Sequence, residues 1–177
     1  MSFFSFGEYI DGHSFKVLDE RVIRASAGIM LLLGAIASIN GFILQNYIIV
    51  PYISGFLMIN FIIGVFINPK IAPTILIARL MTWRQSPLPI GAVQKRFAWS
   101  LGLALSTAIF TLSFYLLKDV SYFEPVCFMC IICILLLFLE SSFGICVGCY
   151  LYRLTLRLRI LPQPKERPNC MGNSCEA

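Results

Sequence analysis

The sequence predicts an all-α membrane protein with four transmembrane helices. Three observations support this fold class: an apolar composition, four long uncharged runs, and a one-sided distribution of basic residues. Hydrophobic residues make up 58% of the chain and charged residues only 13%, whereas soluble proteins carry roughly 25% charged residues. A soluble domain of 177 residues could not bury so many apolar side chains. We therefore expect the lipid bilayer to be the main partner of the chain.

Residues 1–24 are predicted to form a cytoplasmic or interfacial N-terminal segment. The segment carries four acidic residues, whereas a cleavable signal peptide begins with basic residues followed directly by an apolar run. Phe15, Leu18 and Val22 are spaced three and then four residues apart, as on one face of a helix. We expect residues 15–24 to form a short amphipathic helix that leads into the first span.

The first two spans are predicted at residues 25–44 and 48–67. Each run is uncharged and 20 residues long, which suffices to cross about 30 Å of hydrocarbon. The turn at residues 45–47 is short, so the two helices should form an antiparallel hairpin.

The connector at residues 68–96 contains five basic residues and no acidic residue. Within it, Arg79 and Arg84 alternate with apolar side chains, and Trp83 suits the level of the lipid headgroups. This pattern predicts an interfacial helix between spans two and three. The third span is expected at residues 97–117.

The last apolar segment gives a fourth predicted span at residues 125–152, after a polar turn at 118–124. The membrane domain would thus cover residues 25–155, and residues 156–177 would form a cytoplasmic tail.

The basic residues predict the orientation of the four spans. Thirteen of the 14 Lys and Arg residues fall in the N-terminal segment, the connector and the tail, and only Lys118 falls on the other side. Cytoplasmic loops are enriched in Lys and Arg, so both termini should lie in the cytoplasm. Topology also accounts for the net charge of +5, and no nucleic-acid partner is expected.

Five of the seven cysteines lie between residues 127 and 149, together with an acidic residue inside an apolar run, Glu140. Cys127, Cys130 and Cys133 are three residues apart and would share one helix face. Cys146 and Cys149 form a second group. On a continuous helix the 22 residues that separate Cys127 from Cys149 span about 33 Å, whereas a disulfide needs Cα atoms within about 7 Å. A break among the serines and glycines at 141–148 would let the inner pair fold back toward Cys133, and the sequence leaves both possibilities open.

The predicted helix ends set the expected reactivity of these thiols. Pro125 suits a first helical turn, which places Cys127 near a helix N-terminus, where the dipole favours the thiolate. The inner pair would lie near the C-terminus, where the dipole disfavours it, although Arg153 could offset this effect. Glu140 is either a buried functional carboxyl group or a structural one that ties helices together, protonated or paired with an arginine.

Four short elements resemble a bacterial family of four-helix integral membrane proteins that is labelled a domain of unknown function. They are Leu18-Asp19-Glu20-Arg21, Asn68-Pro69, Lys95-Arg96-Phe97-Ala98 and Cys146-Val147-Gly148-Cys149-x-x-Tyr152. The resemblance covers roughly residues 15–155. It implies four spans in a bacterial inner membrane and a link to thioredoxin-type or rhodanese-type sulfur chemistry. The outer cysteines and the tail pair look like additions to the family pattern.

Three functional hypotheses follow. The first is a membrane protein with a thiol redox or sulfur-relay role and a thioredoxin-like or rhodanese-like partner, because exchange needs an attacking and a resolving thiol. Its candidate catalytic residues are Cys146, Cys149, Cys127, Cys130, Cys133 and Glu140. The second is a transporter or binder of a soft metal or a sulfur anion, since thiolates select soft metals, with Cys170 and Cys175 as candidate ligands. The third is a non-catalytic membrane subunit of a larger complex. The sequence names no cofactor and leaves open whether the protein is an enzyme.

Overall fold

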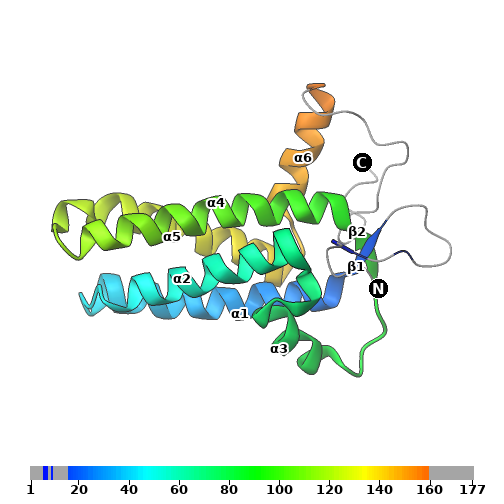
Figure 1. The fold of residues 1–177 in the computed structure, drawn as a ribbon, viewed down its shortest axis with the longest axis horizontal. Coiled ribbons are helices and arrows are strands. Elements are labelled where there is room, and N and C mark those ends of the chain that lie inside the picture. Colours follow the sequence, from blue (N-terminus) through cyan, green and yellow to red (C-terminus); the bar gives the residue numbers. More distant parts are fainter. Residues whose placement is uncertain (1–5, 8, 10–15, 160–177) are drawn as a thin grey trace.

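The computed structural model describes residues 6–7, 9 and 16–159. Four long helices lie side by side in one bundle (Figure 1). Two shorter helices and a small β-ribbon lie at the same end of this bundle, and the two helices leave it in opposite directions. We call this the ribbon end of the bundle.

The four predicted spans are present as long apolar helices. The helices are α1 (Glu20–Ser38), α2 (Ile49–Ile62), α4 (Ala92–Leu116) and α5 (Phe123–Phe138). Three of them continue into π-helical turns, namely η1 (Ile39–Ile43) after α1, η2 (Ile63–Ile67) after α2 and η5 (Leu139–Phe143) after α5. Four segments are long and apolar enough to cross a membrane: Glu20–Ile43, Ile49–Ile67, Ala92–Leu116 and Val120–Phe143. The protein is therefore a multi-pass membrane protein by the length and composition of its helices.

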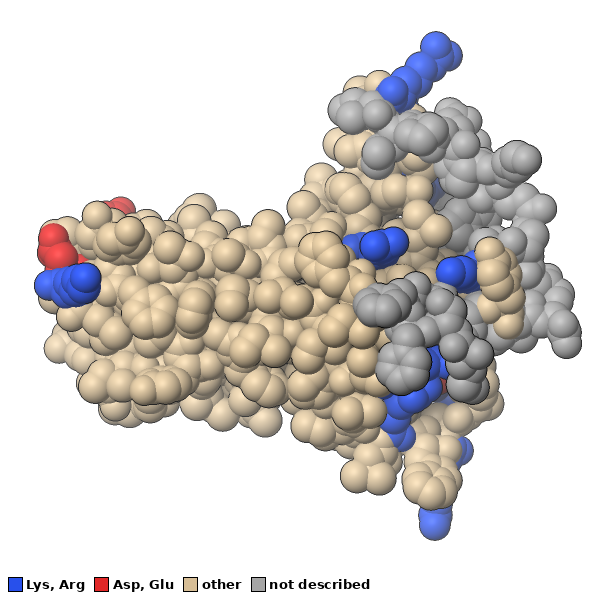
Figure 2. All heavy atoms as spheres, viewed as in Figure 1, with Lys and Arg blue, Asp and Glu red and all other residues tan. Residues whose placement is uncertain are grey.

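The surface of the bundle supports this assignment. Its middle is free of charged side chains in the view of Figure 2, and the charged side chains gather at the two ends. Most of the blue Lys and Arg atoms lie at the ribbon end. Apolar side chains that face outward along a bundle would be costly in water, whereas they suit a lipid environment.

The prediction of a helix over residues 15–24 is wrong for the first half of this segment. Val17–Asp19 forms strand β1, which pairs antiparallel with β2 (Pro89–Gly91). Asp19 then caps α1, because its Oδ1 accepts hydrogen bonds from the backbone N–H groups of Arg21 at 3.1 Å and Leu88 at 3.2 Å. A strong N-cap residue starts the helix at Glu20. The helix consequently begins before the first uncharged run.

The helix predicted in the connector is present as α3 (Pro73–Thr82), after a short 3-10 turn, η3 (Pro69–Ile71). Three fully buried polar side chains hold its first turn. Asn60 of α2 accepts hydrogen bonds at its Oδ1 from Thr74 N at 3.1 Å and from Thr74 Oγ1 at 3.0 Å. Ser26 of α1 lies 2.8 Å from the same hydroxyl. This network joins α1, α2 and α3 and satisfies an N–H group that has no partner within the helix.

Close packing of the second span on α4 depends on a glycine in η2. A Cβ atom on Gly64 would lie 2.0 Å from the ring of Trp99, which is 3% exposed. Phe61, one helical turn earlier, packs against the same ring edge to face at 5.6 Å between centroids. Small residues let membrane helices approach closely. Here the Trp99 ring fills the space that a side chain at position 64 would occupy. Gly64, Phe61 and Trp99 therefore form one packed contact between the second and third spans.

Candidate functional site

The fourth span ends at a glycine turn rather than continuing. After η5, Gly144 adopts φ +68°, in the left-handed region that favours glycine. The N–H group of Ile145 donates to the carbonyl of Leu139 at 3.1 Å, as at many helix C-termini. A separate helix, α6 (Val147–Arg157), then begins. The apolar segment predicted as one span over residues 125–152 is thus two helices.

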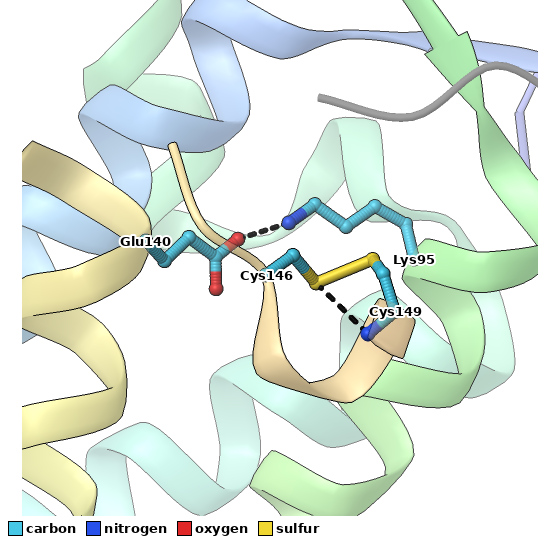
Figure 3. Close-up of a disulfide and its surroundings, with 4 residues drawn as sticks. All are labelled: Lys95, Glu140, Cys146 and Cys149. Atoms are coloured by element: carbon cyan, nitrogen blue, oxygen red, sulfur yellow. Dashed lines mark hydrogen bonds and ion pairs between the residues drawn. A yellow bond between two sulfur atoms is a disulfide. The ribbon is translucent and has the colours of Figure 1, made fainter. Parts of the chain in front are cut away.

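Cys146 and Cys149 form a disulfide at the start of α6 (Figure 3). Their Cα atoms are 5.2 Å apart. Cys146 is the N-cap residue of α6, and its Sγ accepts a hydrogen bond from the N–H of Cys149 at 3.3 Å. Both residues are buried, with exposed fractions of 5% and 7%.

The break reverses the electrostatic environment expected for this pair. The prediction placed Cys146 and Cys149 near a helix C-terminus, where the dipole opposes a thiolate. In the structure they lie at the N-terminus of α6, where the dipole and the free N–H groups stabilise a negative sulfur. The expected dipole effect applied to a continuous last helix, and the structure shows the other possibility that the sequence left open, a break before Cys146.

The glycine between the two cysteines allows α6 to contact α4 directly. A Cβ atom on Gly148 would lie 2.6 Å from the Cβ and 2.7 Å from the Cα of Ala98. One residue earlier on α4, the ring of Phe97 packs on Tyr152 with centroids 5.6 Å apart. Burial raises the pKa of the Tyr152 phenol. The two sequence elements at 95–98 and 146–152 therefore form one packed unit.

An ion pair joins the third and fourth spans next to this unit. Lys95 Nζ, on the first turn of α4, pairs with Glu140 Oε1 of η5 (Figure 3). The Lys95 side chain is only 1% exposed and that of Glu140 is 17% exposed. Lys95 precedes Ala98 by three residues, so both lie on the side of α4 that faces α6. Glu140 therefore ties two helices together, through a lysine rather than an arginine.

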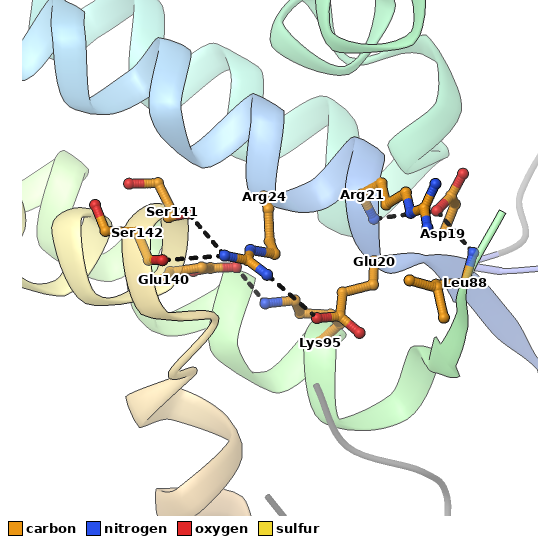
Figure 4. A network of polar contacts seen from close by, with 9 residues as sticks. All are labelled: Asp19, Glu20, Arg21, Arg24, Leu88, Lys95, Glu140, Ser141 and Ser142. Carbon is orange, nitrogen blue, oxygen red and sulfur yellow. Dashed lines mark hydrogen bonds and ion pairs between the residues drawn. The ribbon is translucent and has the colours of Figure 1, made fainter. Parts of the chain in front are cut away.

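Arg24 of α1 caps the end of the fourth span (Figure 4). Its Nη2 donates to the carbonyl oxygens of Ser141 at 3.3 Å and Ser142 at 3.1 Å. Its Nη1 also lies 3.9 Å from Glu20 Oε1, one turn earlier on α1. Carbonyl groups at a helix C-terminus lack partners within the helix, and a cation there is favourable. Arg24 thus fixes the turn from which Cys146 emerges.

Sequence reasoning missed Lys95 and Arg24 as members of the site. The sequence analysis uses Arg24 only as a charge that orients the spans, and it assigns Lys95 no role in a site. A signal was present for Lys95, because it opens one of the short elements that carry the family resemblance. No local pattern pointed to Arg24, since its partners lie 117 and 118 residues later.

The outer cysteines lie elsewhere in the bundle. Cys127, Cys130 and Cys133 are on α5 with free thiols, Cys130 buried and the other two partly exposed. Cys130 and Cys133 border a cavity of about 30 Å³ between the helices. Cys133 precedes Glu140 by seven residues, or about 10 Å along a helix. The three outer thiols are free, although Cys133 packs against the apolar core cluster that also contains Cys146 and Cys149.

The described part of the chain offers no obvious metal centre. Within residues 6–7, 9 and 16–159, no three His, Cys, Asp or Glu side chains gather in a way that could hold a metal ion. The predicted metal candidates Cys170 and Cys175 lie outside the described residues.

Fold and site together define a multi-pass α-helical membrane protein with a Cys-x-x-Cys disulfide at one end of its bundle. The chain belongs to a family described as a domain of unknown function, DUF4395, whose model matches residues 18–157. The predicted membership of such a family is confirmed. Comparisons with curated proteins and with solved structures gave no match.

Proposed function

We propose that the protein is a thiol–disulfide exchange protein of a bacterial inner membrane, in which Cys146 and Cys149 exchange electrons with a cytoplasmic partner. The observation that carries this proposal is the disulfide at the N-terminus of α6. Two cysteines separated by two residues at a helix N-terminus combine an activated thiol with a resolving thiol.

The proposed orientation places the ribbon end in the cytoplasm. Its support is the distribution of 13 of the 14 basic residues over the segments that lead to and from this end, because positive residues favour the cytoplasmic side. Both termini are then cytoplasmic, and the disulfide faces the compartment that holds soluble dithiol proteins. A thioredoxin-like protein is the proposed partner.

The proposed exchange proceeds in two balanced steps. A partner thiolate attacks Cys146 Sγ, which forms a mixed disulfide and releases the electron pair of the broken S–S bond to Cys149. The second partner thiol then attacks the mixed disulfide and releases Cys146. The partner loses two electrons and two protons and becomes a disulfide, while the Cys146–Cys149 pair becomes a dithiol. A partner disulfide reoxidises the pair by the reverse steps.

The assignment of roles follows from the cap of α6. Cys146 Sγ accepts the N–H of Cys149, so a negative sulfur at this position is stabilised by a hydrogen bond and by the helix dipole. Cys146 is therefore the attacking thiolate of the reduced pair, and Cys149 is the resolving thiol. We propose Glu140 as a proton acceptor for the pair. Because both cysteines are buried, exchange requires α6 to move away from α4.

A rhodanese-like partner would use the same pair differently. Its persulfide would transfer the outer sulfur atom to the Cys146 thiolate, and Cys149 would then release hydrosulfide and form the disulfide. One donor persulfide and one dithiol thereby give a donor thiol, hydrosulfide and a disulfide. We assign the outer cysteines no step in either route, since their thiols are free on α5 whereas the disulfide pair lies at the start of α6.

The experiment traps the mixed disulfide. The Cys149→Ser variant keeps the attacking thiol and lacks the resolving one. In nanodiscs, the reduced variant should therefore accumulate a covalent adduct with the disulfide form of a thioredoxin-like protein. The Cys146→Ser variant should form much less of this adduct. Cys130→Ser, in an otherwise unchanged chain, is the control and should form as little stable adduct as the wild type. Equal adduct formation by both inner variants, or none by either, would contradict the assigned roles.

A further inference from the structure

Helix α6 presents an apolar face that nothing in the described structure covers. The helix leaves the bundle sideways at the ribbon end (Figure 1). Cys149 and Tyr152 are buried against the bundle. The opposite face carries large exposed side chains: Tyr150 at 47%, Leu151 at 43%, Leu154 at 48% and Leu158 at 61%.

The spacing of these residues defines an exposed apolar stripe beside a basic stripe on α6. Leu151, Leu154 and Leu158 follow one another at intervals of three and four residues, so they form one stripe. Arg153 and Arg157, four residues apart, form a second stripe along one flank of the first. The helix Val147–Arg157 contains no acidic residue. An exposed apolar stripe with a purely basic flank is the pattern of a helix at the surface of a membrane.

The depth of α6 agrees with this pattern. The fourth candidate span ends at Phe143, four residues before α6 begins, so α6 follows directly on the end of a candidate span. On the other side of the bundle α3 also leaves the ribbon end sideways (Figure 1). It likewise exposes apolar side chains, among them Leu80 at 71% and Met81 at 67%, beside Arg79.

We propose that α6 lies on the cytoplasmic surface of the bilayer, with the Leu151–Leu154–Leu158 stripe among the acyl chains and the basic flank on the phosphate groups of anionic lipids. Charge complementarity selects this occupant. A second copy of the chain would bring to the contact another α6 with basic residues and no carboxylate, whereas an anionic leaflet attracts basic residues near its surface.

The location of α6 has a consequence for the site. The helix begins at the Cys146–Cys149 disulfide, so lipid contact along its outer face holds this disulfide at the level of the headgroups. The lipid contact itself does not depend on any thiol chemistry. It can therefore be tested whether or not the proposed exchange takes place.

Tryptophan fluorescence in proteoliposomes tests the proposal. The chain has two tryptophans, and Trp83→Phe leaves only Trp99, which is buried and serves as the background signal. Leu154→Trp is then added to this variant, and Leu151→Trp is a second, independent probe. Lipids brominated on the acyl chains quench a tryptophan that lies among them, and acrylamide quenches one that lies in water.

The expected result is strong quenching by brominated lipid, little quenching by acrylamide, and a blue-shifted emission for both probes in anionic vesicles. Adding Arg157→Gln should increase quenching by acrylamide in anionic vesicles but have little effect in zwitterionic ones. Acrylamide quenching as strong as that of a free tryptophan would overturn the proposal. Protection that disappears on dilution of the protein in the lipid would also overturn it, because it would assign the face to a second copy.

Discussion

Lys95 and Glu140 form an ion pair that joins the first turn of α4 to the last turn of the fourth span. The two residues are 45 positions apart in sequence, and the Lys95 side chain is almost completely buried. A buried charge without a partner is strongly destabilising, whereas two well-packed apolar residues in place of a buried pair are often tolerated. The pair therefore sets the distance between α4 and the turn that presents Cys146.

Removal of one partner of this pair should be more harmful than removal of both. Lys95→Met is expected to destabilise the protein by about 3–5 kcal/mol, because Glu140 loses its partner. The double variant Lys95→Met/Glu140→Met should recover most of the loss. Unfolding of the four proteins of this cycle in one detergent measures the coupling. Additive single effects would show that the two side chains do not interact.

The contact of α6 with α4 predicts a specific effect of one methyl group. Gly148→Ala should destabilise the protein by about 1–3 kcal/mol, as overpacking does, because the new Cβ meets the backbone of Ala98. It should also speed reduction of the disulfide by a small dithiol, since α6 is pushed away from α4. Gly28→Ala is the matched control, because its Cβ would meet its nearest neighbour, Ser141 Cβ, at an ordinary 3.9 Å. Equal effects of the two substitutions on unfolding would refute the close approach.

The glycine that ends the fourth span should tolerate asparagine better than alanine. Gly144 has φ +68°, and a left-handed conformation costs most residues about 1–2 kcal/mol, while asparagine adopts it more readily. Gly144→Ala should therefore lower the midpoint of thermal unfolding more than Gly144→Asn. The opposite order would mean that the turn is not left-handed.

The polar network under α3 predicts a local effect on that helix. Thr74→Val removes the hydroxyl that meets Asn60 and Ser26, and leaving buried polar groups unsatisfied costs about 1–3 kcal/mol. Hydrogen exchange of the α3 amides should become faster. Thr107→Val is the control, since the Thr107 side chain is exposed and bonds only its own helix at Leu103 O. Unchanged exchange in α3 would contradict an anchoring role for the network.

The four long helices could be predicted from the sequence because the bilayer imposes a requirement that is local in sequence. A span needs about 20 apolar residues without charge, and each run can be found without knowledge of its neighbours. The helix in the connector followed from a similarly local pattern. For these elements the expectation and the structure agree in existence, although their ends differ by several residues.

The features that could not be predicted depend on contacts between residues that are distant in sequence. Strand β1 exists because residues 17–19 pair with residues 89–91, which no pattern near position 17 reveals. The break before Cys146 is formed by the left-handed turn at Gly144, and Arg24 stabilises it through hydrogen bonds to the carbonyl groups of Ser141 and Ser142. Glycine and serine at 141–148 permitted a break without requiring one. The reversed environment of the cysteine pair then followed from the break.

The central claim is that Cys146 and Cys149 change redox state in the cell. Rapid acid quenching of cells, followed by alkylation of free thiols and mass spectrometry, measures the oxidation of each cysteine. The account predicts that the inner pair is a mixture of dithiol and disulfide, that its oxidised fraction rises when cytoplasmic thioredoxin-type reduction is removed, and that Cys130 stays reduced throughout. An inner pair that remains entirely in one state under both conditions would contradict the account.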